Sequence, residues 1–267
     1  MRKITRPGYF RFTLYWLGCL ALAAAGCHPA ATIAAVETAR PAVTLAPPQV
    51  TIFRPTATTT PATPSQTLTS LPLLPDSTPT PSIPAQHYIR NISGHRQYFP
   101  LGCEASAARD WANYFGKDFN EFEFQYKLPI SDNPDLGFVG NVNSAWGQVP
   151  PYAYGVYAGP VADLLNAYGI QAKAYKGYSL DQIKTNIAGD KPVIAWVIGN
   201  VVGGVPAEYT DSHGNKTIVA AYEHVVIVTG YNADHVRYMT NGRFYETPNN
   251  VFLNSWGVLG NMVIVQK

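Results

Sequence analysis

The sequence predicts an α+β fold in which helices come first along the chain and an antiparallel sheet follows. Residues 104–115 and 160–168 each place apolar side chains on one helical face, and each is followed by a glycine. From residue 192 onward the pattern changes to short runs rich in β-branched side chains. Helices followed by strands, instead of alternating with them, are typical of the α+β class.

Four helices are expected before the sheet. The first is 104–115, and the second, 121–128, follows a capping asparagine and stops before a proline. The third is 160–168, with proline at its first position, and the fourth begins at the capping box 179–182 and is closed by Gly189. We expect these helices to pack on the sheet, with a reactive residue at the start of the first one.

The rest of the domain is expected to be sheet, one long loop and one short helix. The expected strands are 193–198, 217–221, 224–229, 236–239 and 262–265, with a short helix at 249–256. The irregular stretch 131–159 contains glycines and the aromatic residues Phe138, Trp146, Tyr152, Tyr154 and Tyr157. A loop of that length is usually functional, so we expect it to form a wall of a substrate cleft; the alternative is a surface loop packed by its own aromatic rings.

The N-terminal segment predicts export. Residues 1–26 carry basic side chains, then an apolar run that is too short to span a bilayer comfortably, then small residues before Cys27. That ending resembles a bacterial lipobox, although Ala24 stands where leucine is commonest. We therefore expect residues 1–26 to be a lipoprotein signal peptide and Cys27 to be the lipidated first residue of the mature protein. The alternative is a plain secretory signal with an incidental cysteine.

Residues 27–86 are expected to form a stalk. They are rich in threonine and proline and carry few charges, so they cannot bury a core. Proline stiffens such a segment toward an extended conformation, and its threonines are candidates for O-glycosylation. The stalk would hold the globular domain, residues 87–267, away from the extracellular face of a bacterial cell membrane.

Charge and motifs exclude several functions for residues 87–267. Of the 19 Lys and Arg in the chain six precede residue 87, and of the 17 Asp and Glu two do, which leaves 13 basic and 15 acidic residues in the domain. A slightly negative domain does not indicate nucleic-acid binding. No phosphate loop and no cluster of metal ligands is apparent, so we expect no cofactor and no metal. The domain is expected to act as a monomer on a peptide or protein substrate.

Cys103 is the candidate nucleophile. It opens the first expected helix, and unpaired backbone N–H groups and the helix dipole favour a thiolate at that position. Cys19 would leave with the signal and Cys27 would be blocked by lipid, so Cys103 would be the only free thiol of the exported protein. The alternative is that Cys103 is a small buried apolar residue.

Two other residues complete a possible catalytic set. His224, on an expected strand, could take the thiol proton and return it to the leaving amine. Gln97, six residues before the cysteine, could donate its amide to the oxygen of a tetrahedral intermediate, together with the backbone N–H of Cys103. The order Gln, Cys, His therefore predicts a thiol hydrolase.

A third side chain should orient the histidine ring. If the strands that hold His224 and Tyr238 form a hairpin turning at residues 232–233, Asn241 stands opposite His224 and could accept a hydrogen bond from its ring. A shift of one residue would put Thr240 there instead. Asn241 also precedes a glycine and can equally be a turn residue.

These residues resemble the C39-like peptidases, relatives of the papain-type cysteine proteases. The likeness covers nearly all of residues 87–267 and rests on five segments: 97–103, 137–141, 146–147, 223–231 and 252–265. It implies a papain-like fold with helices packed on a C-terminal antiparallel sheet, Cys103 as nucleophile, His224 as general base and acid, and Gln97 as oxyanion donor. It also implies an extracellular lipoprotein type.

One part of the pattern departs from the family. Members usually carry Asp-Pro after the strand that follows the histidine, whereas this chain has Thr240-Asn241. A second candidate for the orienting residue is Asn254, because residues 254–257 match the asparagine motif of papain; it ranks below Asn241, since the short helix there more simply packs Phe252 and Trp256 into the core.

Three functions remain open on the sequence. The first is a surface-anchored cysteine peptidase that works through an acyl-enzyme. The second is a weak or inactive papain-fold binding module that holds peptide or glycan with its aromatic loop. A cell-wall amidase ranks lowest, because the Asp-Cys-Ser context of such hydrolases is absent around Cys103.

Overall fold

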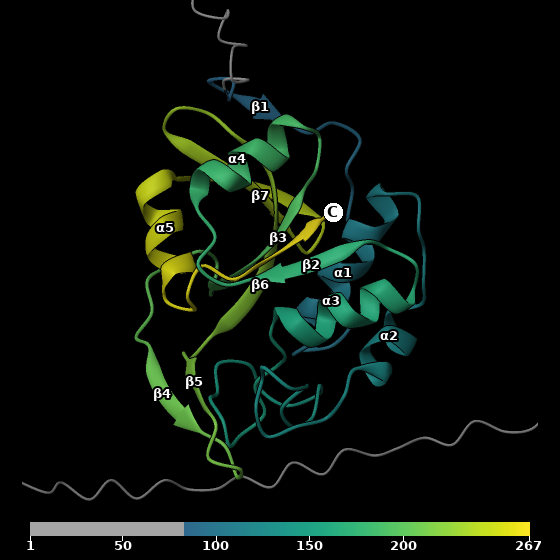
Figure 1. Ribbon diagram of the computed structural model, residues 1–267, viewed down its shortest axis with the longest axis vertical. Coiled ribbons are helices and arrows are strands. Elements are labelled where there is room, and N and C mark those ends of the chain that lie inside the picture. Colours follow the sequence, from purple (N-terminus) through teal and green to yellow (C-terminus); the bar gives the residue numbers. More distant parts are fainter. Residues whose placement is uncertain (1–82) are drawn as a thin grey trace, which may run out of the picture. The chain divides into compact units, whose positions relative to one another are not determined.

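The computed structural model describes residues 83–267 (Figure 1). The expected signal peptide, the lipidation of Cys27 and nearly all of the expected stalk lie outside the described residues. Among residues 83–267, no helix is both long enough and apolar enough to cross a membrane.

The core of the domain is a seven-stranded antiparallel sheet. Its strands run in the order β2-β9-β3-β6-β7-β8, with β1 paired to β6. They are β1 (His87–Tyr88), β2 (Ala172–Tyr175), β3 (Val193–Ile198), β6 (Glu223–Tyr231), β7 (His235–Thr240), β8 (Arg243–Pro248) and β9 (Val263–Gln266). A separate hairpin is formed by β4 (Ala207–Thr210) and β5 (Lys216–Val219). β3 and β6 are buried along their whole length, so they form the centre of the sheet.

Five helices pack around the sheet within the described part of the chain. They are α1 (Cys103–Tyr114), α2 (Glu121–Lys127), α3 (Ala158–Ala167), α4 (Leu180–Ala188) and α5 (Asn249–Gly257). Helix α1 lies against β6 and β3, with Trp111 fully buried and its indole N–H donating to Pro192 O at 2.7 Å. Helices α1, α2 and α3 gather on one side of the domain and α5 lies on the other (Figure 1). This arrangement confirms the expected α+β class.

The caps that the sequence predicts are present. Asn120 accepts the Glu123 N–H at the start of α2, and Ser179 and Gln182 form a reciprocal capping box at the start of α4. The strands β1, β2, β4 and β8 were not expected. They are short or lie at sheet edges and in the outer hairpin, where neighbouring strands and not an alternating pattern decide their conformation.

Candidate active site

Cys103 is the first residue of α1 and follows the N-cap Gly102, as the sequence predicts. The side chain is largely buried, yet it lines a small cavity of about 10 Å³. The cavity lies where two strands separate, because the β6–β7 ladder ends at the pair Ile227 and Met239. Its other lining residues include Gln97, Ser106, Asp110, Val225, Thr240 and Asn241. The helix start therefore delivers the thiol to the open end of a strand pair.

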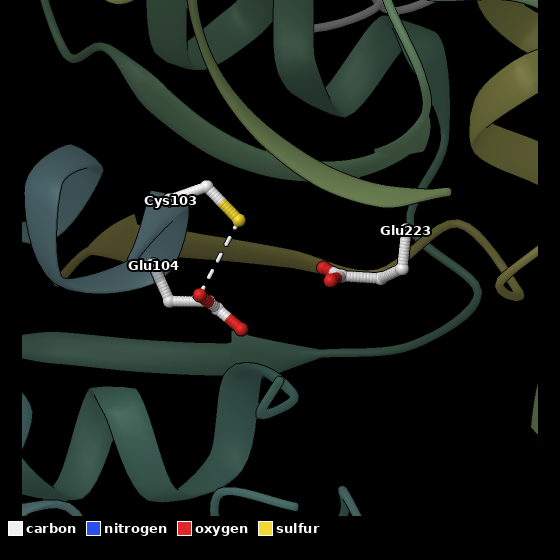
Figure 2. Close-up of side chains that lie close together, drawn as sticks. All are labelled: Cys103, Glu104 and Glu223. Carbon is white, nitrogen blue, oxygen red and sulfur yellow. Dashed lines mark hydrogen bonds between the residues drawn. The ribbon is translucent and has the colours of Figure 1, made fainter. Parts of the chain in front are cut away.

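Two buried carboxyl groups surround the thiol (Figure 2). Cys103 Sγ donates a hydrogen bond to Glu104 Oε2 at 3.3 Å, and one carboxylate oxygen of Glu223 lies within 4.8 Å of both groups. The backbone N–H of Val225, one residue after His224, also faces the sulfur. Glu104 and Glu223 are nearly inaccessible to solvent, and sequence reasoning did not single out either. The available signal was their position, since each is the immediate neighbour of a candidate catalytic residue.

The surroundings raise the pKa of the thiol instead of lowering it. Burial is the largest cause, and the carboxyl groups of Glu104 and Glu223 add to it, so the pKa of Cys103 lies well above its ordinary value. Burial also raises the pKa of Glu104 to about 7 and the pKa of Glu223 well above its ordinary value. The thiolate that the helix N-terminus alone would favour is thus opposed by its neighbours, and Cys103 rests as a neutral thiol.

His224 lies on β6 and is buried. Its Nε2 forms a hydrogen bond of 2.8 Å with Thr240 Oγ1, and burial lowers the pKa of the ring to about 4. The ring is therefore neutral at physiological pH, as a general base must be. No hydrogen bond joins the ring to the Cys103 thiol among residues 83–267.

The expected contact between Asn241 and the ring is wrong. The observed register places Ile227 opposite Met239, whereas the expected register pairs it with Tyr238, and the ladder ends at this pair. Beyond the end of the ladder, His224 Nε2 bonds Thr240 Oγ1. Asn241 adopts a positive φ of 50°, and its Oδ1 accepts the backbone N–H of Gln97 at 3.1 Å. Asn241 thus serves as the turn residue that the sequence left open, and it anchors the Gln97 segment.

Asn254, the other candidate, lies on α5 with its side chain exposed. Phe252 and Trp256 on the same helix are fully buried, and Ser255 bonds the backbone of Ile198. This confirms that the helix packs into the core. The residue that hydrogen-bonds the histidine ring is Thr240.

Gln97 lines the same cavity as Cys103, but its amide is engaged. Its Nε2 donates to Phe99 O at 2.8 Å and to Pro100 O at 3.2 Å. Its role as an oxyanion donor remains a prediction, because the amide would have to turn from these carbonyls toward the cavity.

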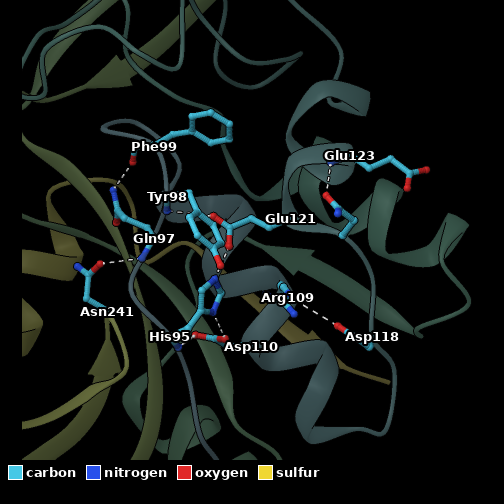
Figure 3. A network of polar contacts seen from close by, with 11 residues as sticks. His95, Gln97, Tyr98, Phe99, Arg109, Asp110, Asp118, Glu121, Glu123 and Asn241 are labelled. Atoms are coloured by element: carbon cyan, nitrogen blue, oxygen red, sulfur yellow. Dashed lines mark hydrogen bonds and ion pairs between the residues drawn. The ribbon is translucent and has the colours of Figure 1, made fainter. Parts of the chain in front are cut away.

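A buried polar network holds the segment before Gln97 (Figure 3). His95 Nδ1 contacts Asp110 Oδ1 on α1 at 2.6 Å, and His95 Nε2 contacts Glu121 Oε2 on α2. The backbone N–H groups of His95 and Tyr98 donate to the same two carboxylates. Burial lowers the pKa of His95, but the hydrogen bonds and charges of Asp110 and Glu121 outweigh it, so the net pKa is raised. The network fixes the Gln97 segment to both helices.

The long loop covers the site from the other side. Trp146 donates its indole N–H to Glu223 O at 2.8 Å, and its ring meets His224 edge-on with centroids 6.0 Å apart. Phe138, Tyr154 and Tyr157 are buried, whereas Tyr152 is exposed. Most of the loop aromatics are therefore core residues, and Trp146 is the one that lies against His224.

Comparisons with known proteins show similarity in family and in fold. The Peptidase_C39 like family matches residues 86–263. A putative C39-like peptidase from Bacillus anthracis has a similar structure, with a TM-score of 0.61 at 20% identity over 68% of this chain and 97% of that one. Xylellain, a cysteine protease from Xylella fastidiosa, aligns with a TM-score of 0.40 at 14% identity over 70% of this chain and 87% of that one. The comparison with curated proteins gave no match.

The α1 helix that carries Cys103, the strand that carries His224 and the antiparallel sheet together form the papain-like fold of these peptidases. With two thirds of its length matched by the family, this chain belongs to the C39-like peptidase family.

Proposed function

We propose that this protein is a cysteine peptidase that cleaves peptide bonds at the bacterial cell surface. One observation carries the proposal: Cys103, Gln97 and Thr240 line a single cavity, and the Thr240 hydroxyl holds the ring of His224 at 2.8 Å. Membership of a peptidase family supports it. We assign the roles of nucleophile, base and oxyanion donor in acyl transfer to Cys103, His224 and Gln97. Cys103 and Gln97 line the cavity, and His224 bonds Thr240, which lines it as well.

The proposed reaction starts from a neutral pair. With Nε2 held by Thr240, Nδ1 of His224 is the nitrogen that accepts the thiol proton as Cys103 turns from Glu104 and attacks the peptide carbonyl. The protonated ring then gives that proton to the leaving amine, which leaves an acyl group on Cys103. Water, deprotonated by the same ring, hydrolyses the thioester and restores the thiol.

The test is hydrolysis of an unfolded protein substrate by the full chain. Cys103→Ala should abolish cleavage while the fold is kept, and Gln97→Ala should lower kcat by about a hundredfold, as the loss of an oxyanion donor does elsewhere. The exposed Glu123→Gln variant is the matched control and should cleave like the wild type. Turnover at the wild-type rate by Cys103→Ala or by Gln97→Ala would rule out this mechanism.

A binding module without turnover is the second candidate, and two observations favour it. The thiol donates to Glu104 with a raised pKa, and a hydroxyl stands where the family usually has the carboxylate that stabilises the protonated ring. Retention of peptides by the wild type without any cleavage, and unchanged retention by Cys103→Ala, would support this function.

We also propose that the protein is anchored by a lipid on Cys27, with the Thr/Pro-rich stretch as a stalk. The support is the sequence of residues 1–86 alone. Metabolic labelling with a fatty acid should mark the wild type and leave Cys27→Ala unlabelled. Equal partition of both proteins into the soluble fraction would contradict the anchor.

A further inference from the structure

We propose that Cys103, Glu104 and Glu223 form a binding site for a thiophilic divalent cation, with Zn²⁺ as the best fit, directly on the candidate nucleophile. Occupation of this site would block the thiol reversibly. The binding claim stands on the cluster itself, whereas its regulatory meaning rests on the proposed peptidase function.

The donor set and its spacing suit zinc. One thiol sulfur and two carboxylate oxygens lie within 4.8 Å of one another (Figure 2). The Cys103 Sγ to Glu104 Oε2 distance is 3.3 Å. In a tetrahedral site with Zn–S near 2.3 Å and Zn–O near 2.0 Å, the two ligand atoms are about 3.5 Å apart. Cys103 and Glu104 thus already have this spacing, the Glu223 carboxylate, within 4.8 Å of both, would move closer on binding, and the fourth position would stay open to water.

An unsatisfied ligand atom points into the cluster. Glu223 is 3% exposed, and its Oε1 has no hydrogen-bond partner among residues 83–267. Figure 2 shows its carboxylate directed toward Glu104 and the thiol. A buried polar atom without a partner is costly, and metal coordination is one way in which proteins satisfy such an atom.

Within the described part of the chain, no positive side chain forms a salt bridge with these acids, Glu104 and Glu223. Within the same residues, Glu104 is the charged group that shifts the pKa of Glu223. Buried carboxyl groups are normally protonated, paired with a cationic side chain or bound to a metal. Binding of a divalent cation would release the thiol proton and any carboxyl proton to solvent, and the cation would balance two of the three negative charges of the deprotonated cluster.

The backbone around the carboxylates is shaped to orient them. Glu104 Oε1 accepts the Val156 N–H at 2.7 Å, which leaves Oε2 directed at the thiol. Gly155 passes so close that a Cβ there would overlap Glu104 Oε1. The Trp146 indole holds the backbone carbonyl of Glu223 at 2.8 Å. Such contacts around the ligands fix their direction and typically affect metal affinity by about 10–100-fold.

The experiment measures Zn²⁺ binding and thiol protection on the full chain. Zn²⁺ binding is followed by equilibrium dialysis, and alkylation by iodoacetamide is quantified by mass spectrometry on the peptide that contains Cys103, with Mg²⁺ as the hard-cation control. We expect one Zn²⁺ that protects Cys103 and binds more tightly as pH rises, and no protection by Mg²⁺. Co²⁺ should give a thiolate-to-metal charge-transfer band that Cys103→Ser lacks.

The matched variants separate the cluster from other zinc ligands. Glu104→Gln and Glu223→Gln keep the side-chain shape and should each weaken binding of the protecting Zn²⁺ by tenfold or more. Asp211→Asn, between β4 and β5 and outside the cluster, should not weaken it. Should a variant fail to fold, protection of the wild type by Zn²⁺ still decides the point. Unprotected Cys103 at saturating Zn²⁺, or equal protection in folded Glu104→Gln and Glu223→Gln, would overturn the site. Because alkylation needs no peptide substrate, a lack of hydrolysis would remove the proposed function and leave this result intact.

Discussion

Replacement of Glu104 by glutamine should make Cys103 more reactive. The wild-type thiol donates to Glu104 Oε2 at 3.3 Å, so a thiolate would form directly beside a carboxylate that is itself ionised above its pKa of about 7. Glutamine keeps the shape of the side chain and removes that charge. The pKa of the Cys103 thiol should therefore fall in the variant.

The size of the effect follows from the distance. Two like unit charges 3.3 Å apart repel by about 5 kcal/mol at an effective dielectric constant of about 20. This corresponds to about 3.7 pKa units and is a ceiling. A thiolate also loses intrinsic nucleophilicity as its pKa falls, with a Brønsted coefficient of about 0.4–0.5. A fall of two pKa units would then leave about a tenfold gain in rate where the thiolate is the minor species. Glu223 still opposes ionisation, so we expect about tenfold and not the ceiling.

The assay is iodoacetamide labelling of the full chain between pH 5 and pH 9, quantified on the peptide that contains Cys103. Below the Glu104 pKa of about 7 the carboxyl group is neutral in the wild type, so the two proteins should label at similar rates; above it the variant should label faster. Glu123→Gln removes an exposed carboxylate on α2 and serves as the control. Equal or slower labelling of Glu104→Gln at pH 8 would refute the electrostatic account of this thiol.

Three further changes test other parts of the structure. Thr240→Asp places a carboxylate beside the His224 ring, so it should raise the pKa of that ring above about 4 and increase kcat. An NMR titration of the ring and steady-state kinetics measure the two effects. An unchanged ring pKa would contradict the observed Nε2 contact. His95→Gln leaves Asp110 and Glu121 buried without their cation and should cost about 3 kcal/mol of unfolding free energy. Because the pKa of His95 is raised in the folded state, this loss of unfolding free energy should be full below about pH 6.5 and should shrink as pH rises through the folded pKa. Urea unfolding at several pH values measures it. A loss that does not depend on pH would contradict the charged network. Gly155→Ala forces a side chain onto Glu104 at a φ of 139° and should destabilise the domain by about 1–3 kcal/mol in thermal unfolding, whereas Gly177→Ala, also at positive φ but in open space, should lack the steric part of that cost.

Sequence patterns predicted most of the regular structure because local chemistry decides it. The capping residues Asn120 and Ser179 and the helix stops at Gly116 and Gly189 act within a few residues of chain, and the expected helices lie where these signals put them. The edge strand β8 and the outer strand β4 were missed, since their side chains are largely exposed and show no alternation.

The site was harder to predict because its contacts depend on register and on burial. The β6–β7 ladder ends at the pair Ile227 and Met239, before it reaches His224, so strand register could not decide whether Asn241 or Thr240 bonds the ring. The helix start of Cys103 predicted an activated thiolate, but Glu223 comes from a strand 120 residues away, and only the fold shows that it opposes that charge. The His95 network likewise joins three segments, and no local pattern links them.

The central claim is that Cys103 and His224 perform acyl transfer. In the most direct measurement, the full chain is incubated with a peptide library and the reaction is quenched during turnover. Mass spectrometry then detects new peptide N-termini and any acyl group on the peptide that contains Cys103. We predict both signals in the wild type, neither in Cys103→Ala, and a strong reduction of both in His224→Ala. New N-termini that persist in Cys103→Ala, or a wild type that binds peptides and forms neither product nor acyl adduct, would contradict the account.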